Sequence, residues 1–381
     1  MFEHTKRFCD SLLGLGVPGF DLAVYQDGKC LLRYMNGYSD LENRVKMSGS
    51  ERYNIYSCSK LITCVAALQL WEKDLFSLDD KLSDYMPEFS NMAVDTGNGI
   101  KEAENPILIK HLFEMTAGFS YRCTSSPELC QAVVETGGRC STIETMRYLA
   151  RSPLLFEPGD RWEYSLCHDV LAALIEVIVG QPFYEYVRQN IFVPLGMNDS
   201  TFMLPEKELH TVAEQYLFEN GEIKNIGKNI FKFKFGREYA SGGAGCISTV
   251  DDYIKFLEEL RVGNKILKRE TIDFMVTDRL TEYQKRTYSL KDTYGYGLGC
   301  RCPKYDKKYV DFGWGGAACA YLAVDIQNKI SLYFGTHVLA SPAQEVRSIL
   351  YQFVLAELTD NGELDNVYSN LKKIHNHNLT Y

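Results

Sequence analysis

The sequence contains no long apolar run and no surplus of positive charge. None of its 381 residues lies in a stretch that approaches the roughly 18 consecutive apolar side chains of a membrane-spanning helix. It has 50 Asp and Glu against 41 Lys and Arg, a formal net charge of −9. A protein that holds nucleic acid non-specifically is expected to show the opposite balance or a basic patch. We therefore expect neither a membrane nor a nucleic acid as partner, and no feature indicates an oligomer.

The sequence also lacks a secretory signal and the usual metal-binding motifs. Charges between Glu3 and Arg7 precede only a short apolar stretch at 12–17, which does not read as a signal peptide. The 12 cysteines are scattered from Cys9 to Cys319, a pattern typical of reduced thiols in a cytosol. No C-x-x-C pair and no H-E-x-x-H motif occurs. We expect a cytoplasmic protein with no metal and no other cofactor.

The order of strand and helix patterns predicts the fold class. Residues 21–35 predict two strands joined by a turn at Asp27-Gly28, a favoured hairpin pair. Residues 56–73 predict a helix that is apolar nearly all round and therefore buried. Glycine-punctuated strand patterns resume from about 294. The order indicates an α/β (α+β) protein with an antiparallel sheet built from both chain ends and a helical lobe between them. Further helices are predicted at 107–115, 143–150, 168–179, 184–190, 251–261 and 342–358.

No repeat, low-complexity tract or long linker divides the chain. We therefore expect a single catalytic domain over residues 1–358. Its sheet lobe would comprise about 8–55 and 285–358, and its helical lobe about 56–284. Residues 359–381 form a polar tail that either frays or caps the last helix.

The segment from Ser57 to Lys60, at the start of the predicted buried helix, can carry nucleophilic chemistry. The two residues are three positions apart, so they lie on one helix face. A Ser hydroxyl needs a base, and a Lys desolvated in an apolar pocket can be neutral enough to serve. A helix N-terminus adds backbone N–H groups and a dipole that favour an oxyanion. The same spacing recurs at Ser369 and Lys372 in the polar tail, but only Lys60 precedes an apolar helix.

Two further segments are candidates. Tyr164 lies on an aromatic-rich loop after the Pro158-Gly159 turn, where a Tyr can act as a general acid or base, or simply pack under the loop. Glycines in the strand-like segment 312–317 mark either the close approach of a ligand, or a bulge or tight sheet–helix contact. The glycine-rich segment 241–245 lacks the spacing of a phosphate loop, and we interpret it as a tight turn at the lobe boundary. No G-x-S-x-G nucleophile elbow occurs.

Taken in order, these segments resemble the class C β-lactamase-like serine hydrolase family, which also contains penicillin-binding DD-peptidases, esterases and some acyltransferases. The resemblance runs from about Val17 to Leu358. It is carried by the stretches VPGFDLAVYQDG, YSCSKLITCVAALQLWEKDLFSLDDKLSDYMPEF, IKHLFEMTAGFSY, FEPGDRWEYSLCHDVL, NIFVPLGMNDSTF, SGGAGCISTVDDYIKFL, YGYGLG and FGWGGAACAYLAVD.

The resemblance implies a two-step acyl transfer through a Ser57 acyl-enzyme. It implies that Lys60 takes the Ser57 proton and that Tyr164 passes a proton to the leaving group, with the two roles coupled. It also implies an oxyanion hole made of the backbone N–H groups of Ser57 and Ala317. Substrate contacts are expected from Leu166, Trp314, Gly315 and Gly316.

Two departures from the family pattern bear on the substrate. Leu166 stands where the Tyr-x-Asn motif has an amide, and Trp314 stands where the Lys-Thr-Gly or His-x-Gly motif has a cation. Both changes resemble the esterase branch and disfavour β-lactams and peptidoglycan peptides, which present a carboxylate. We therefore expect a carboxylesterase acting on small or apolar acyl esters. Acyl transfer to an alcohol or amine, β-lactamase or D-amino acid peptidase or amidase action, and a non-catalytic scaffold remain alternatives.

Overall fold

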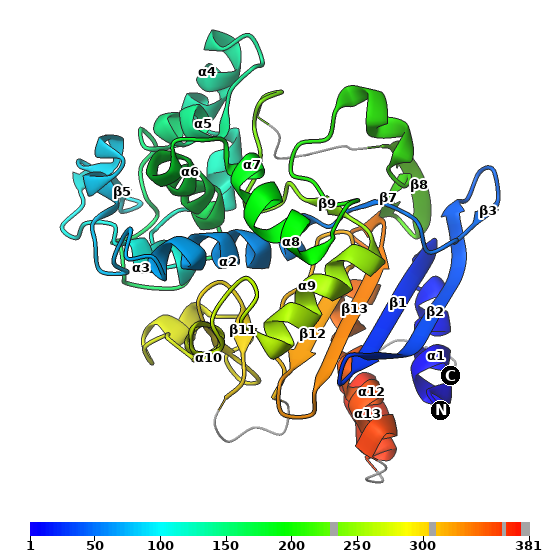
Figure 1. The fold of residues 1–381 in the computed structure, drawn as a ribbon. Coiled ribbons are helices and arrows are strands. Elements are labelled where there is room, and N and C mark those ends of the chain that lie inside the picture. The colour runs from blue at the N-terminus through cyan, green and yellow to red at the C-terminus, as the bar shows by residue number, and fades with distance from the viewer. Residues whose placement is uncertain (229–234, 305–309, 360–362, 375–381) are drawn as a thin grey trace.

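The computed structural model describes residues 1–228, 235–304, 310–359 and 363–374. The chain folds into two lobes that lie side by side (Figure 1). One lobe is built on a five-stranded antiparallel sheet of order β12-β13-β1-β2-β3. Its strands are β1 (Gly19–Gln26), β2 (Lys29–Asp40), β3 (Val45–Lys46), β12 (Tyr321–Asp325) and β13 (Ile330–Thr336).

The sheet joins the two ends of the chain, as the sequence predicts. Strand β1 pairs along its length with β13, with Ala23 opposite Tyr333. Its other edge pairs with β2 through a hairpin whose two turn residues, Asp27 and Gly28, have φ angles of 48° and 78°. Positive φ at both central positions is the requirement of a type I′ turn, and the Asp-Gly pair meets it at low cost. The predicted hairpin and the α/β (α+β) fold class are confirmed.

Helices cover both faces of this sheet. Helix α9 (Val250–Val262) packs across β1, β12 and β13 on one face. On the other face α1 (Glu3–Leu13) packs on α12 (Ile349–Thr359), and their apolar residues share a core with the inner residues of β1 and β13. The segment predicted as helical lobe, about 56–284, therefore includes a helix that the structure places against the sheet.

Part of the polar tail is helical. Helix α13 (Leu364–Ile374) packs on α12 through Val367 and Leu371, both at most 1% exposed. Residues 375–381, which complete the predicted tail, lie outside the described residues. The single helix predicted at 342–358 is instead two, α11 (Ala343–Val346) and α12, with a break at Arg347–Ser348.

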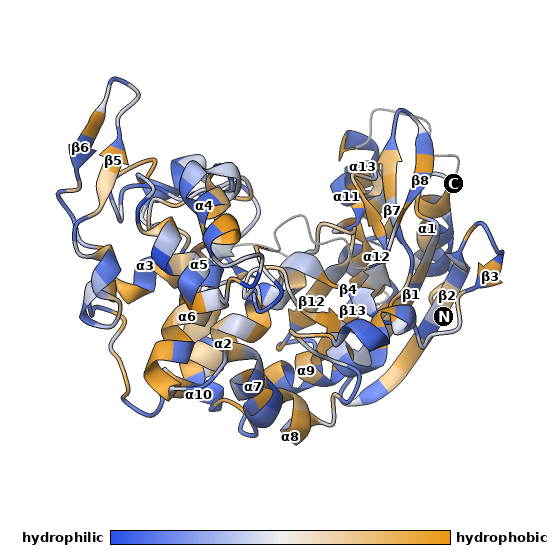
Figure 2. Ribbon diagram, turned by 90° about the horizontal axis from the view of Figure 1, so that it is seen from above, coloured by the Kyte–Doolittle hydropathy of each residue, from blue (hydrophilic) through white to orange (hydrophobic). Residues whose placement is uncertain are grey.

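The second lobe is mainly helical. Its central helix is α2 (Ser59–Trp71), every residue of which is buried as far as Leu70, as its all-round apolar sequence predicts. Helix α2 packs on α6, and Figure 2 shows the two side by side within the helical lobe. The other helices are α3 (Ile109–Phe113), α4 (Pro127–Glu135), α5 (Thr142–Leu149), α6 (Cys167–Val179), α7 (Phe183–Val187), α8 (Val193–Leu195) and α10 (Arg269–Met275).

Short sheets complete the molecule. They are β4 (Tyr53–Asn54) with β9 (Ile247–Ser248), β5 (Ala93–Asp95) with β6 (Ile100–Glu102), β10 (Gly295–Tyr296) with β11 (Arg301–Cys302), and β7 (Gln215–Glu219) with β8 (Glu222–Gly227) and β14 (Val338–Leu339). In the described part of the chain no single helix has the length and apolar content to cross a membrane. The bent pair Cys167–Val179 and Phe183–Leu195 meets that test only when taken together.

Candidate active site

Ser57 lies on a 3₁₀ turn, Tyr56–Cys58, that leads directly into α2. The preceding residue, Tyr56, has a φ of 46°, a conformation that bulky side chains rarely adopt. Backbone in such a region persists only where the surrounding structure holds it, and such residues cluster at active sites. The Ser57 side chain is partly exposed, so it is open to a ligand.

Lys60 is fully buried one turn after Ser57. Its Nζ lies 3.4 Å from Ser57 Oγ and donates to the hydroxyl of Tyr121 and the carbonyl oxygen of Gly243, both at 2.8 Å. Burial lowers the pKa of the Lys60 ammonium. Tyr121, Tyr164 and Asp169 together raise that pKa by more than burial lowers it, so the net shift is upward. These surroundings favour the protonated form of Lys60, whereas the role expected of it from sequence needs the neutral form.

Tyr164 contacts both Ser57 and Lys60. Its hydroxyl donates to Ser57 Oγ at 2.5 Å, and its ring centroid lies 4.6 Å from Lys60 Nζ. The loop that carries it is tied to the lobe by a hydrogen bond from Glu163 N to Met115 O at 2.9 Å. Tyr164 is partly exposed like Ser57, so the structure brings the three predicted catalytic side chains together with two of them open to a ligand.

The glycine-rich strand segment approaches the nucleophile from the sheet lobe. A Cβ on Gly316 would lie 2.5 Å from the carbonyl oxygen of Ile55, two residues before Ser57, so only glycine permits this approach. Gln344 Nε2 donates to Ala317 O at 2.7 Å, and Arg347 Nη1 donates to Gly316 O at 2.6 Å. The backbone at Ala317 is thus fixed beside the turn that carries Ser57.

The predicted substrate contacts divide into two groups. Trp314 and Gly315 are partly exposed on this segment, as is Ala317 of the predicted oxyanion hole, whereas Gly316 is buried against Ile55. Leu166 is 1% exposed and belongs to the core of the helical lobe at the start of α6. The Leu166 side chain therefore packs against protein, and its predicted substrate contact is at odds with that position.

Sequence reasoning missed three residues that surround Lys60. They are Tyr121 and Gly243, which accept from its Nζ, and Asp169, a buried carboxylate in the first turn of α6. Asp169 Oδ1 accepts from Tyr239 OH and Ser241 Oγ, both at 2.6 Å. The loop 241–245 is therefore more than the tight turn that was predicted, because Asp169 holds it against Lys60. One signal was available: Asp169 follows Tyr164 closely in the sequence and lies in the first turn of a helix, where a carboxylate is favoured.

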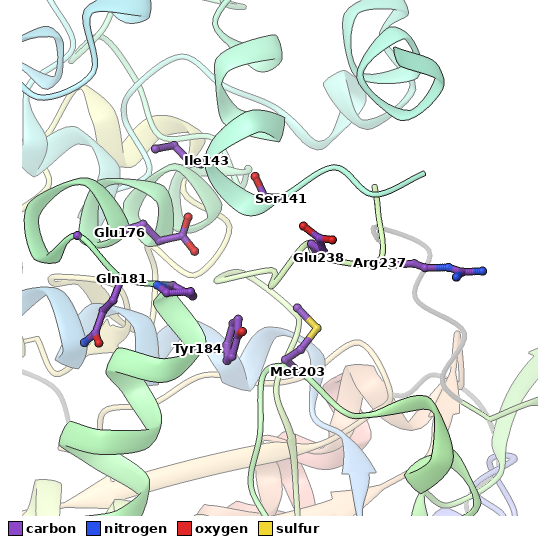
Figure 3. Close-up of a pocket in the computed structure, with 10 residues that line it drawn as sticks. Ser141, Ile143, Glu176, Gln181, Tyr184, Met203, Arg237 and Glu238 are labelled. Carbon is purple, nitrogen blue, oxygen red and sulfur yellow. The ribbon is translucent and has the colours of Figure 1, made fainter. Parts of the chain in front are cut away.

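A pocket of about 560 Å³ lies elsewhere, between α6, α7 and the start of α5 (Figure 3). It contains none of the predicted site residues. Glu176 Oε1 accepts from Phe183 N at 2.8 Å, and Glu238 forms an ion pair with Arg139. The two carboxylates that line this pocket therefore already have partners. Its lining residues are Ser141, Ile143, Glu176, Gly180, Gln181, Pro182, Tyr184, Met203, Arg237 and Glu238. The described residues contain no group of three or more His, Cys, Asp or Glu placed to hold a metal ion.

The family model described as Beta-lactamase matches residues 6–354, nearly the whole chain. The chain therefore belongs to the β-lactamase family, as the resemblance implied. Its fold and family make it a β-lactamase-family serine hydrolase.

Similar proteins include both hydrolases and transferases. ML-236A carboxylate methylbutanoyltransferase mlcH of Penicillium citrinum is 30% identical over 274 residues, which cover 68% of this chain and 64% of that protein. Esterase EstB of Burkholderia gladioli is 28% identical over 276 residues, 66% of this chain and 67% of that protein. The solved structure of EstCE1, a hydrolase with promiscuous acyltransferase activity, has a TM-score of 0.72 at 23% identity and covers 88% of this chain and 95% of that one. At that identity the structural likeness shows the fold alone.

Proposed function

We propose that this protein is a carboxylesterase that acts on small or apolar acyl esters through an acyl-enzyme on Ser57. The observation that carries the proposal is the 2.5 Å hydrogen bond between Tyr164 and Ser57, with the buried Lys60 ammonium 3.4 Å from the same oxygen. A nucleophile that shares a hydrogen bond with a phenol able to give and take a proton, and that lies near a fixed charge, has the parts that acyl transfer needs. No cofactor enters the proposed reaction.

The reacting form has Tyr164 ionised, so that the hydrogen bond runs from the Ser57 hydroxyl to the Tyr164 oxygen. In the first step Ser57 Oγ attacks the ester carbonyl carbon and its proton passes to that oxygen. The negative charge moves to the former carbonyl oxygen, where the backbone N–H groups of Ser57 and Ala317 are proposed to receive it. The carbon–oxygen bond to the leaving group then breaks. The departing alkoxide takes the proton from Tyr164 and leaves as an alcohol.

In the second step a water molecule gives a proton to Tyr164 and attacks the acyl carbon. The bond to Ser57 breaks, the proton returns to Ser57 Oγ, and the free acid leaves. Lys60 stays protonated throughout, because its surroundings raise its pKa. Its charge stabilises the negative charge that Tyr164 carries between proton transfers. Tyr164 thereby takes the base role that the sequence suggested for Lys60 and keeps its own proton transfer to the leaving group.

The proposed substrate class rests on two polar groups that the site lacks, one at position 314 and one at position 166. A tryptophan at position 314 offers no positive charge to a substrate carboxylate. Leu166 carries no amide for a substrate amide group. Both features support a neutral ester over a β-lactam or a D-amino acid amide, and the 28% identity to Esterase EstB supports the same choice.

Acyl transfer to an alcohol or amine is the second candidate. The specific observation in its favour is the 30% identity to the methylbutanoyltransferase mlcH. The chemistry differs only in the second step, where an acceptor hydroxyl or amine replaces water at the acyl carbon.

The deciding experiment compares wild type and Ser57→Ala on a short-chain p-nitrophenyl ester and on a chromogenic cephalosporin. We expect ester turnover that disappears in Ser57→Ala, with little cephalosporin turnover. Product analysis with an added alcohol or amine then separates the two candidates, since free acid alone contradicts the transferase. Cephalosporin preferred over ester would contradict the substrate argument. Absence of Ser57-dependent turnover on both would contradict the proposed esterase.

A further inference from the structure

The hydroxyl of Tyr164 has two hydrogen-bond partners. It donates to Ser57 Oγ at 2.5 Å and accepts from the indole Nε1 of Trp314 at 3.3 Å. A phenol oxygen has one proton and two acceptor positions, and an indole N–H can only donate. Trp314 therefore occupies an acceptor position of the same oxygen that faces the nucleophile.

The indole of Trp314 is held in place from several sides. The backbone carbonyl of Trp314 accepts from Leu322 N at 3.1 Å, which ties this residue to the start of β12. Its ring lies against Tyr164, with centroids 5.7 Å apart and an interplanar angle of 30°. The ring of the fully buried Tyr296 makes a T-shaped contact with it, with centroids 5.5 Å apart and planes at 80°. A donor fixed in this way needs no reorganisation when charge appears on its acceptor.

We propose that Trp314 is a positioning residue for Tyr164: its indole N–H directs the phenol oxygen toward Ser57 and stabilises that oxygen when it is ionised. This rests on the proposed function, in which Tyr164 takes the proton of Ser57. It goes beyond the substrate contact expected of Trp314. The polar atom of this side chain is engaged by Tyr164, so its apolar ring surface is what a substrate meets.

The chain offers a matched control in Trp162. Its ring also lies along Tyr164, at 6.2 Å between centroids and 23° between planes. Its Nε1 is buried and has no hydrogen-bond partner among the described residues. Trp314→Phe and Trp162→Phe thus replace comparable indole neighbours by a smaller aromatic ring, but only the first removes a hydrogen bond to Tyr164.

The experiment measures the ionisation of Tyr164 directly, by ultraviolet difference titration of each protein against the same background carrying Tyr164→Phe. Because a hydrogen bond to a charged group is lost, Trp314→Phe should make ionisation about ten-fold less favourable, a shift of about one pH unit upward. The pH dependence of the p-nitrophenyl ester acylation burst should move by the same amount. Trp162→Phe should leave both midpoints in place.

Equal shifts in the two variants, or no shift in Trp314→Phe, would overturn the role of Trp314. A general loss of packing would lower the burst rate at every pH without moving its midpoint, and that result also overturns it. Site-specific replacement of Trp314 by β-(3-benzothienyl)alanine keeps the ring size and removes only the N–H, so it should reproduce the shift even if Trp314→Phe folds poorly. The titration requires no turnover, so a failure of the esterase proposal is seen separately, as wild type without Ser57-dependent activity.

Discussion

At the scale of single residues, the buried charge of Lys60 organises the site. Its Nζ donates to the Tyr121 hydroxyl and to the Gly243 carbonyl oxygen. The Asp169 carboxylate also raises the pKa of Lys60 through its negative charge. An ammonium at 0% exposure is costly unless such partners are present. Desolvation alone would favour a neutral amine, so the partners decide the protonation state. This balance is what sequence reasoning about a desolvated lysine omitted.

Replacing this lysine by an apolar side chain of similar length tests the role of the charge. Lys60→Met should lower kcat/KM for a p-nitrophenyl ester by about 10²–10⁴-fold, because Tyr164 loses the cation that stabilises its ionised form. Lys110→Met, which removes an exposed ion pair with Asp79, serves as the control and should leave kcat/KM unchanged. Ester hydrolysis within ten-fold of wild type in Lys60→Met would contradict the role.

At the scale of elements, the site depends on two approaches between segments far apart in the sequence. The strand segment 312–317 reaches the Ser57 turn through Gly316, and the loop 241–245 reaches Lys60 through Gly243. The sequence marks both segments by their glycines, and it predicts that the first faces a ligand or another backbone. It does not reveal which backbone, because the partner Ile55 is about 260 residues earlier in the chain.

The first approach can be tested by adding a methyl group. Gly316→Ala places a Cβ where Ile55 O would be 2.5 Å away, so the segment must move off the nucleophile turn. Because the backbone N–H of Ala317 moves with it, we expect kcat to fall by about 10²–10³-fold while KM changes little. Gly14→Ala is the control, since its φ is −68° and its added Cβ would lie 3.3 Å from Ser11 O. An unchanged kcat in Gly316→Ala would argue against an oxyanion site at Ala317.

At the scale of the whole molecule, buried titratable groups make stability depend on pH in opposing directions. Burial, together with the charge of Lys60, lowers the pKa of His168 to about 3. Burial raises the pKa of Asp21 to about 7, although Arg33 pairs with it. Between these two pKa values, His168 binds a proton in the unfolded chain but not in the folded protein. Asp21 does the opposite: it binds a proton in the folded protein but not in the unfolded chain.

The two opposing contributions to the pH dependence of the free energy of unfolding can be separated with one variant for each group. The His168 contribution is complete above the unfolded pKa of about 6.5 and is lost as pH falls toward 3. The Asp21 contribution is complete below about 3.9 and is lost as pH rises toward 7. Between pH 4 and 6 each corresponds to about 1.4 kcal/mol per pH unit. His168→Gln should remove a rising slope from the free energy of unfolding, and Asp21→Asn should remove a falling one, both measured by urea denaturation. Slopes equal to wild type would contradict these assignments.

The sequence by itself determined the local features of this protein. The Asp27-Gly28 turn, the buried helix that begins beside Ser57 and the order of strands and helices follow from rules that act over a few residues, and the structure bears them out. The spacing of Ser57 and Lys60 sets their contact for the same reason, since they lie one helical turn apart.

Only the tertiary structure decided what surrounds those residues. Tyr121 and Gly243 contact Lys60 from two separate segments, and Asp169 binds the loop of Gly243 from a third. Trp314 contacts Tyr164 across 150 residues of chain. Such contacts depend on how helices and strands pack, and no periodicity or spacing in the sequence encodes them. The protonation state of Lys60 is set by these contacts through charge and desolvation, both of which act through space, not along the chain.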